Sequence, residues 1–195
     1  MKRQIAGVLC AAMLTGIFSG CGKQETSVKN FTAPESGEDI VCIQVENYGE
    51  IKIKLFSDLM PKACENFTGL AESGYYNELT FHRVIPNFMI QGGDPKGNGT
   101  GGSDKTIRGE FSKNGVENNI SHKRGVISMA RLQDNNSASS QFFIMHEDGD
   151  YLDGSYAAFG HDVVDKIAEN TPVTDSNGTV LKETQPIIEK IVITD

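Results

Sequence analysis

Positive charge is scarce in this sequence. Its 195 residues include 18 lysines and arginines against 26 aspartates and glutamates, which gives a formal net charge of −8 at pH 7. An acidic chain repels phosphate backbones and anionic lipid head groups. We therefore do not expect nucleic acid as a partner.

Residues that ligate metals are few and scattered. The chain has four cysteines and four histidines, and none stands at a spacing typical of a metal site. A nucleophile-elbow motif is also missing. We therefore expect no metal site. Cys42 and Cys64 could pair in an oxidising compartment, but two isolated cysteines with apolar neighbours are more often separate buried thiols.

The apolar run Ile5–Phe18 is too short for a membrane span, which takes about 20 residues. It follows a basic start and precedes small residues, so residues 1–20 resemble a signal peptide. Phe18-Ser19-Gly20-Cys21 further resembles a bacterial lipobox, in which the cysteine is lipidated and becomes the mature N-terminus, although Phe18 stands where leucine is usual. The alternative is an ordinary signal peptide with Cys21 an incidental thiol.

Residues 21–38 are polar and have almost no apolar side chain. They cannot bury enough surface to order themselves, so we expect a flexible tether. Removing residues 1–20 takes away two basic residues and no acid, which changes the net charge from −8 to −10. More than one acyl chain on Cys21 would anchor the protein stably. The sequence thus predicts an extracytoplasmic, membrane-anchored lipoprotein, with residues 39–195 as one globular domain.

Alternation and turn residues predict about eight short strands in that domain. Ile51–Leu55 alternates apolar residues with lysines and is expected to pair with the preceding strand as a hairpin. Helices are predicted at 61–73, with Cys64, Phe67, Leu70 and Ala71 on one face, and at 163–170. The strands are predicted at 40–46, 51–55, both sides of Pro86-Asn87, 125–130, 141–145, 156–160 and 187–193. This pattern indicates an antiparallel sandwich or barrel, and periodicity does not choose between them.

One arginine stands in an apolar stretch, Phe81-His82-Arg83-Val84-Ile85-Pro86-Asn87-Phe88-Met89-Ile90-Gln91-Gly92-Gly93-Asp94. A guanidinium in such surroundings costs desolvation energy unless its donors find partners. With Gln91 eight residues on and Phe88 and Met89 between them, it favours a pocket that takes an apolar ligand and hydrogen-bonds one polar bond of it. The plainer alternative is a surface arginine whose stem packs on apolar neighbours.

This stretch closely resembles the signature of the cyclophilin-type peptidyl-prolyl cis-trans isomerases. Three further blocks resemble the same family: Pro61–Phe67, Gly125–Ala130 with Ser140–Ile144, and Tyr151–Gly154 with Phe159-Gly160. The resemblance covers roughly residues 40–195. It implies a mostly β fold, a closed eight-stranded antiparallel barrel capped by two helices. It also implies isomerase activity on proline-containing polypeptides without a cofactor, and we expect a monomer.

By position, the resemblance implies that Arg83 is the catalytic residue. It implies a proline pocket made by Phe88, Met89, Phe143 and Leu152, and groove positions that hold the peptide backbone at Gln91, Ala130 and Arg131. Two more substrate-binding positions depart from the best-known members of the family. Tyr151 replaces a tryptophan that is a main contact for cyclosporin, and Tyr156 replaces a histidine that lines the proline pocket.

The glycine-rich segment Gly92–Gly102 contains Gly97-x-Gly99-x-x-Gly102, which formally matches a dinucleotide-binding fingerprint. That fingerprint must follow a strand and open a helix, whereas here a Gly/Pro loop precedes it and no helical stripe follows. We therefore reject a nucleotide site. In the family that the sequence resembles, this loop rims the substrate groove.

Two other functions stay open. A cyclophilin-like module could bind proline-containing segments with little turnover, an alternative motivated by Tyr151 and Tyr156. A solute-binding lipoprotein is a weaker alternative, because that class typically needs a larger, two-lobed chain. Isomerase chemistry based on a guanidinium predicts a pH–rate profile without a bell near neutrality, and His82 is then expected to be a structural, hydrogen-bonded histidine.

Overall fold

The structure is a computed structural model and describes residues 40–161 and 165–194. The predicted signal peptide, Cys21 and the tether lie outside the described residues. Within the described part, no helix combines the length and the apolar character that a membrane span requires.

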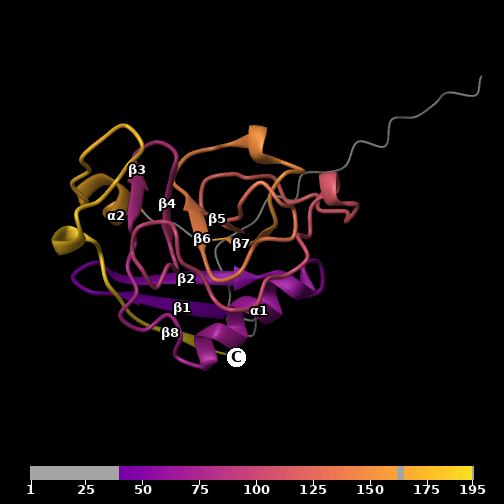
Figure 1. The fold of residues 1–195 in the computed structure, drawn as a ribbon, viewed down its shortest axis with the longest axis horizontal. Coiled ribbons are helices and arrows are strands. Elements are labelled where there is room, and N and C mark those ends of the chain that lie inside the picture. Colours follow the sequence, from indigo (N-terminus) through magenta and orange to yellow (C-terminus); the bar gives the residue numbers. More distant parts are fainter. Residues whose placement is uncertain (1–39, 162–164, 195) are drawn as a thin grey trace, which may run out of the picture.

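Eight strands form one antiparallel sheet (Figure 1). The sheet has the order β3-β4-β6-β5-β7-β2-β1-β8. The strands are β1 (Ile40–Val45), β2 (Gly49–Leu55), β3 (Arg83–Ile85), β4 (Met89–Gly92), β5 (Val126–Met129), β6 (Phe142–Met145), β7 (Ala158–His161) and β8 (Ile188–Thr194). The mostly β prediction and the β1–β2 hairpin are confirmed.

Helix α1 (Pro61–Glu72) packs against β8, and helix α2 (Asp165–Asn170) contacts β3 and β4. Three 3₁₀ turns complete the described elements: η1 (Ser112–Asn114), η2 (Asp150–Leu152) and η3 (Lys182–Thr184). The predicted helix at 163–170 is therefore present from Asp165 onward, and its first two residues lie outside the described part.

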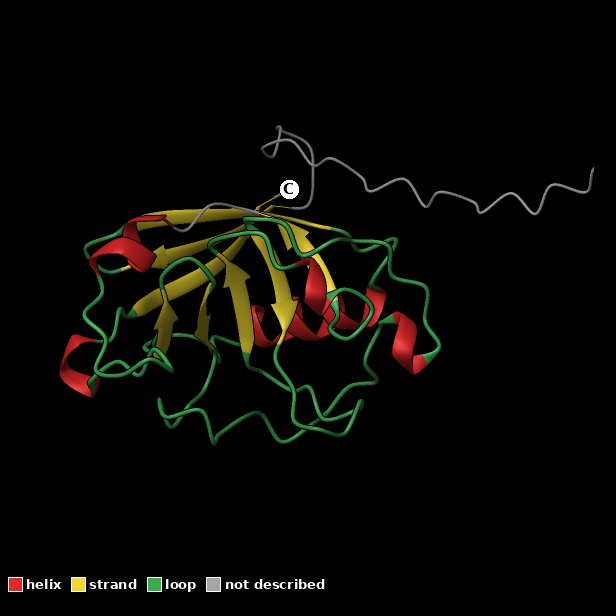
Figure 2. Cartoon of the chain, turned by 90° about the horizontal axis from the view of Figure 1, so that it is seen from above, coloured by secondary structure: helices red, strands yellow, loops and turns green. Residues whose placement is uncertain are grey.

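The sheet is strongly curled, but it does not close into the barrel that the resemblance implied (Figure 2). Strands β3 and β8 are its two edges. The chain just before β3 approaches β8 through a few backbone bonds, such as Glu78 N to Ile188 O at 2.8 Å and Ile188 N to Leu79 O at 2.7 Å. Glu78 has a φ of 64°, a left-handed conformation that bends the chain out of a strand. Past Phe81 the chain leaves β8: Arg83 bridges Thr179 and Val84 N donates to Gly178 O at 2.8 Å, so the ladder that would close the barrel stops.

Helix α1 buries an apolar face in the hollow of the sheet. Pro61 occupies its first turn, where a missing N–H costs nothing, and Ala63, Cys64, Phe67 and Ala71 are buried. The predicted face is confirmed except that Leu70 lies only half-buried at its edge. The side chain of the N-cap residue, Met60, does not cap α1. Instead, the buried carboxylate of Glu110 accepts from Lys62 N at 3.2 Å and from Ala63 N at 2.9 Å.

Phe67 of α1 holds the centre of the core. Its ring centroid lies 5.2 Å from those of Tyr76 and Phe142 and 5.4 Å from that of Phe159. The edge-on geometry with Phe142 is a favourable arrangement for aromatic rings. Cys42 and Cys64 are both buried as separate thiols, and Cys64 Sγ donates to Phe159 O at 3.7 Å. This core fixes β6, which carries part of the site.

Candidate functional site

The two polar residues of the signature stretch face the same side of the sheet because of strand register. Arg83 in β3 pairs with Gln91 in β4, and Val84 pairs with Ile90. Val84 and Ile90 are fully buried in the core, so Arg83 and Gln91, on the alternate face, point away from it. Strand alternation thus explains how a guanidinium stands within an apolar run at little desolvation cost.

The Arg83 guanidinium is held from two sides. Its Nε donates to the carbonyl of Asn177 at 2.8 Å, and its Nη1 donates to Gln91 Oε1 at 3.2 Å. Gln91 Nε2 in turn donates to Gln141 Oε1 at 2.9 Å. These two bonds use two of the five guanidinium N–H groups and fix the plane of the cation. Because the plane of the guanidinium is fixed, the directions of its other N–H donors are fixed as well.

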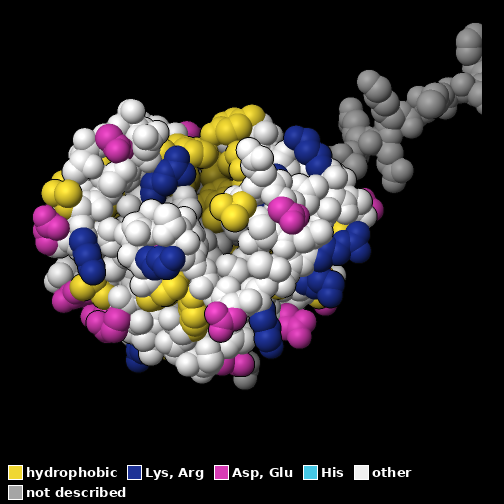
Figure 3. All heavy atoms as spheres, viewed as in Figure 1, with side chains coloured by type: hydrophobic (Ala, Val, Ile, Leu, Met, Phe, Trp, Pro, Cys, Tyr) yellow, Lys and Arg dark blue, Asp and Glu magenta, His cyan; other side chains and the backbone are white. Residues whose placement is uncertain are grey.

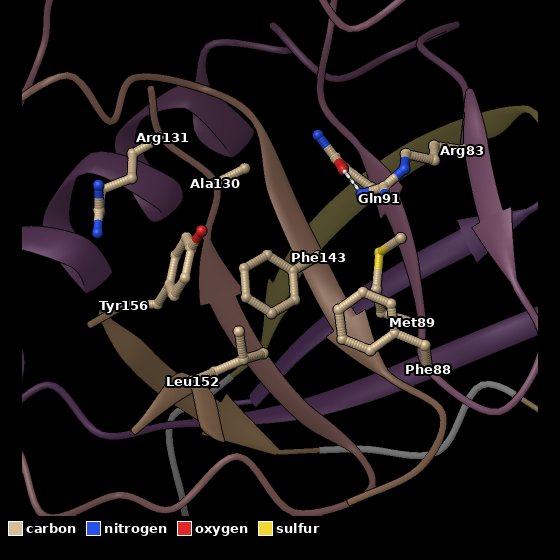
Figure 4. Close-up of a pocket in the computed structure, with 9 residues that line it drawn as sticks. All are labelled: Arg83, Phe88, Met89, Gln91, Ala130, Arg131, Phe143, Leu152 and Tyr156. Atoms are coloured by element: carbon tan, nitrogen blue, oxygen red, sulfur yellow. Dashed lines mark hydrogen bonds between the residues drawn. The ribbon is translucent and has the colours of Figure 1, made fainter. Parts of the chain in front are cut away.

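An apolar floor lies beside this cation. Phe143 in β6 is the register partner of Gln91, and Met89 precedes Gln91 by two residues on the same face of β4. A pocket of about 240 Å³ opens over them. It is lined by Arg83, Phe88, Met89, Gln91, Ala130, Arg131, Phe143, Leu152 and Tyr156 (Figure 4). Figure 3 shows apolar side chains gathered in a hollow on the face toward the viewer.

Nine predicted site residues therefore meet around one pocket, although they come from separate parts of the chain. Tyr151 is the exception. Its side chain is 72% exposed and its ring lies 6.0 Å from that of Phe88, outside the pocket lining. Tyr151 precedes Leu152 in η2, and this tight turn directs the two side chains differently. It stands at the rim, where a longer ligand would pass.

A second hollow of about 350 Å³ adjoins the pocket and shares Gln91, Ala130 and Arg131 with it. The glycine-rich loop forms its other wall. Buried Asp94 fixes this loop by accepting from Asn98 N at 3.0 Å and Gly99 N at 2.6 Å. Burial by itself would raise the pKa of Asp94, but the backbone N–H groups around it lower that pKa below its usual value. No helix begins directly after the loop, where the next described element is the short 3₁₀ turn η1 at Ser112–Asn114, so the helix that a dinucleotide fingerprint must open is not there.

Three residues that sequence reasoning missed support the pocket. Gln141 links Gln91 to the glycine-rich loop by donating to Gly101 O at 2.7 Å, and its place in the second family block was the available signal. Asn177 acts through a backbone carbonyl, so its side-chain type carries no signal. His122 stacks on Phe143 with ring centroids 6.1 Å apart.

His122 belongs to a buried series of hydrogen bonds. Its Nδ1 lies 2.8 Å from Asp153 Oδ1 and its Nε2 lies 3.1 Å from Ser128 Oγ. Burial lowers the pKa of His122, while Asp153 opposes that shift. The order resembles a hydrolase triad, but Ser128 is fully buried and its hydroxyl cannot meet a substrate. The series instead supports the floor of the pocket.

His82 is buried and does not line the pocket. Neither of its ring nitrogens reaches full hydrogen-bond geometry with a described residue. Burial lowers the pKa of His82, while the nearby Asp94 and the Thr80 backbone, which interacts with the ring, act in the opposite direction. The hydrogen-bonded histidine therefore stays a prediction. Across the described ranges, no group of three or more His, Cys, Asp or Glu side chains could hold a metal ion.

Comparison with known proteins points to one family. Residues 40–194 match the family model described as "Cyclophilin type peptidyl-prolyl cis-trans isomerase/CLD". The chain is 44% identical over 140 residues to peptidyl-prolyl cis-trans isomerase-like 2 of Rhizopus delemar, covering 68% of this chain and 25% of that protein. It is 45% identical over 113 residues to peptidyl-prolyl cis-trans isomerase-like 1 of Aspergillus niger, covering 57% of this chain and 68% of that protein.

The fold has solved counterparts as well. A Cryptosporidium parvum cyclophilin type peptidyl-prolyl cis-trans isomerase, crystallised in the presence of the dipeptide Ala-Pro, superimposes with a TM-score of 0.70 at 36% identity. That match covers 80% of this chain and 99% of the other. By contrast, the chain spans only about a quarter of the Rhizopus relative.

Proposed function

Because the chain belongs to the cyclophilin-type peptidyl-prolyl cis-trans isomerase family, we propose that it accelerates rotation about X–Pro bonds in protein chains. The observation that carries this proposal is the oriented guanidinium of Arg83 at the edge of an apolar pocket. The pocket is sized for a small apolar ring, and the Arg83 guanidinium is fixed beside it. A proline ring with its preceding amide has that combination of groups.

The chemistry requires a donor that acts only in the transition state. The X–Pro bond has partial double-bond character, with a rotation barrier of about 18–20 kcal/mol, and its uncatalysed exchange takes tens to hundreds of seconds. When the amide twists, resonance is lost and the prolyl nitrogen becomes pyramidal and regains a lone pair. A guanidinium N–H of Arg83 can donate to that lone pair, which the planar ground state does not offer. Such differential binding lowers the barrier.

The apolar floor has a separate task in this mechanism. Phe143, Met89 and Leu152 hold the proline ring still while the preceding carbonyl swings around the bond. Surroundings with little water also favour the twisted amide, which is less polar than the planar one. Neither a nucleophile nor a cofactor takes part in these steps.

The test compares the full chain with its Arg83→Ala variant. The cis-to-trans relaxation of a short X–Pro peptide is followed at catalytic protein concentrations. Losing one preorganised transition-state donor typically costs about 10²–10³ in rate, and we expect a fall of that size. Arg108→Ala is the matched control, because Arg108 is exposed and its guanidinium donates only to Asn114 O among the bonds described.

Two outcomes would contradict the proposal. An Arg83→Ala variant as fast as the wild type would remove the arginine from the mechanism. A folded wild type that binds X–Pro peptides without accelerating their exchange would instead favour the alternative of a peptide-binding module.

We further propose an extracytoplasmic setting, in which lipid on Cys21 anchors the protein and secreted chains are the substrates. This proposal is supported by the sequence of residues 1–38, with its basic start, apolar run, lipobox-like Phe18–Cys21 and polar tether. Mass spectrometry of the mature N-terminus tests it. A diacylglyceryl cysteine at position 21 is expected, and an unmodified Cys21 would refute the anchor.

A further inference from the structure

The side chain of Arg131 lines the pocket, but its N–H groups donate to backbone carbonyls of this same protein. Nε and Nη2 donate to the carbonyl of Ser155 at 3.1 and 2.8 Å. Nη1 donates to Leu132 O at 2.8 Å and, at a longer 3.4 Å, to Gln133 O. A guanidinium bound in this way is poorly placed to hold the backbone of a peptide, which is the role that the family resemblance implied for this position.

The same guanidinium lies over the faces of two aromatic rings. Its central carbon lies 5.0 Å from the ring centroid of Phe111 and 4.7 Å from that of Tyr156. Both distances are within the range of a cation–π interaction. Phe111 is only 1% exposed, so it is a fixed support. Figure 4 shows Tyr156 standing between Arg131 on one side and Phe143 on the other.

Tyr156 connects Arg131 to the apolar floor of the pocket. Its ring meets that of Phe143 edge to face, with centroids 5.7 Å apart and an interplanar angle of 87°. The residue before Tyr156 is Ser155, whose carbonyl accepts both Arg131 bonds. Arg131 therefore fixes the backbone at Tyr156 and the face of its ring together. A planar guanidinium can do both, whereas an ammonium has no flat face and no fork of donors.

We infer that Arg131 is a positioning residue that holds Tyr156 as a wall of the proline pocket and thereby sets the affinity for the prolyl ring. This inference rests on the proposed function of the pocket. The pocket contacts the prolyl ring of the substrate equally in the cis, trans and twisted states, so the Tyr156 wall contributes uniform binding. Loss of uniform binding raises KM and leaves kcat unchanged. Arg83 is expected to show the opposite split.

The experiment is a double-mutant cycle in the full chain. It uses Arg131→Ala, Tyr156→Leu and the double variant, with Arg108→Ala as a control that also removes one surface arginine. The dissociation constant of a short X–Pro peptide and the KM and kcat of its isomerisation are measured for each. Thermal unfolding verifies that each variant folds, and Arg131→Lys replaces Arg131→Ala if the alanine variant does not.

We expect Arg131→Ala to weaken peptide binding and raise KM about tenfold, which corresponds to about 1.4 kcal/mol. Arg131→Lys should show most of the same loss, because lysine keeps the charge but lacks the planar fork. In the Tyr156→Leu background, Arg131→Ala should cost almost nothing more, since the ring that it positions is gone. Arg108→Ala should match the wild type.

The inference is overturned if Arg131→Ala leaves affinity unchanged, lowers kcat alone, or costs the same in both backgrounds. Equal cost would mean that Arg131 contacts the peptide itself. Because the cycle is also run on peptide affinity, a wild type that binds peptides without turnover would refute isomerase activity while still deciding the role of Arg131. A wild type that binds no X–Pro peptide refutes both.

Discussion

Gln91 offers a sharp test of how the Arg83 guanidinium is oriented. Its side-chain oxygen accepts from Arg83 Nη1 at 3.2 Å, and its amide nitrogen donates to Gln141. Gln91→Leu puts an apolar side chain of similar bulk, though one atom shorter, in place of the amide and so removes the acceptor. The family resemblance implies that Gln91 holds the peptide backbone, whereas the structure shows it bound to Arg83. The two roles predict different kinetics.

The size of the effect follows from the geometry of this bond. A hydrogen bond to a charged group contributes about 1.5–3 kcal/mol, and 3.2 Å lies at the long end of the usual distances. Arg83 also keeps its second anchor, the Asn177 carbonyl. We therefore take the lower end of the range and expect kcat to fall about tenfold, which is about 1.4 kcal/mol of transition-state stabilisation. KM should change little.

The assay is the full progress curve of X–Pro peptide exchange at several substrate concentrations, which separates kcat from KM. Gln44→Leu is a matched control, since Gln44 is a half-buried glutamine on β1 whose amide donates to Glu50 at 3.2 Å. An unchanged kcat with a raised KM in Gln91→Leu would refute orientation of Arg83 and favour a direct contact with the peptide.

Two further predictions concern stability. Burial lowers the pKa values of His82 and His122 below the usual value, so below about pH 6.5 the unfolded chain binds more protons than the folded one. The free energy of unfolding should therefore be highest above that pH. It should fall as the pH drops, by at most about 1.4 kcal/mol per pH unit for each histidine. Urea unfolding at pH 5 to 8 checks this, and a flat profile would contradict it. Glu110→Gln removes the charge that caps α1 and should cost about 2 kcal/mol and lower Tm by about 6 °C. The exposed Glu117→Gln is the control, and equal Tm values would argue against the cap.

Much of the local structure was predictable from the sequence. Ile51–Leu55 alternates with the period of a half-buried strand, and Pro61 with the spacing of Cys64, Phe67 and Ala71 indicates a helix. Both signals depend on neighbours within a few residues. The site residues came from the family signature instead, and the structure brings nine of them to one pocket.

Side-chain orientation was less predictable at the edge of the site. Tyr151 was expected among the substrate-binding residues but stands at the rim, because the η2 turn separates it from Leu152. Arg131 was expected to hold a peptide, yet it lies between Phe111 and Tyr156. Phe111 lies 20 residues before Arg131 and Tyr156 lies 25 residues after it, so no local sequence pattern predicts that these three side chains meet.

The sequence by itself determined the strands, the main helix, the family and the set of residues at the pocket, because side-chain period and signature motifs are properties of short segments. Tertiary structure alone decided whether the sheet closes, since Gly178 and Thr179, and not β8, pair with the outer side of β3. It also placed the Asn177 carbonyl on Arg83, 94 residues away in the chain. Such contacts depend on how distant segments pack, and packing is settled only when the whole core is assembled.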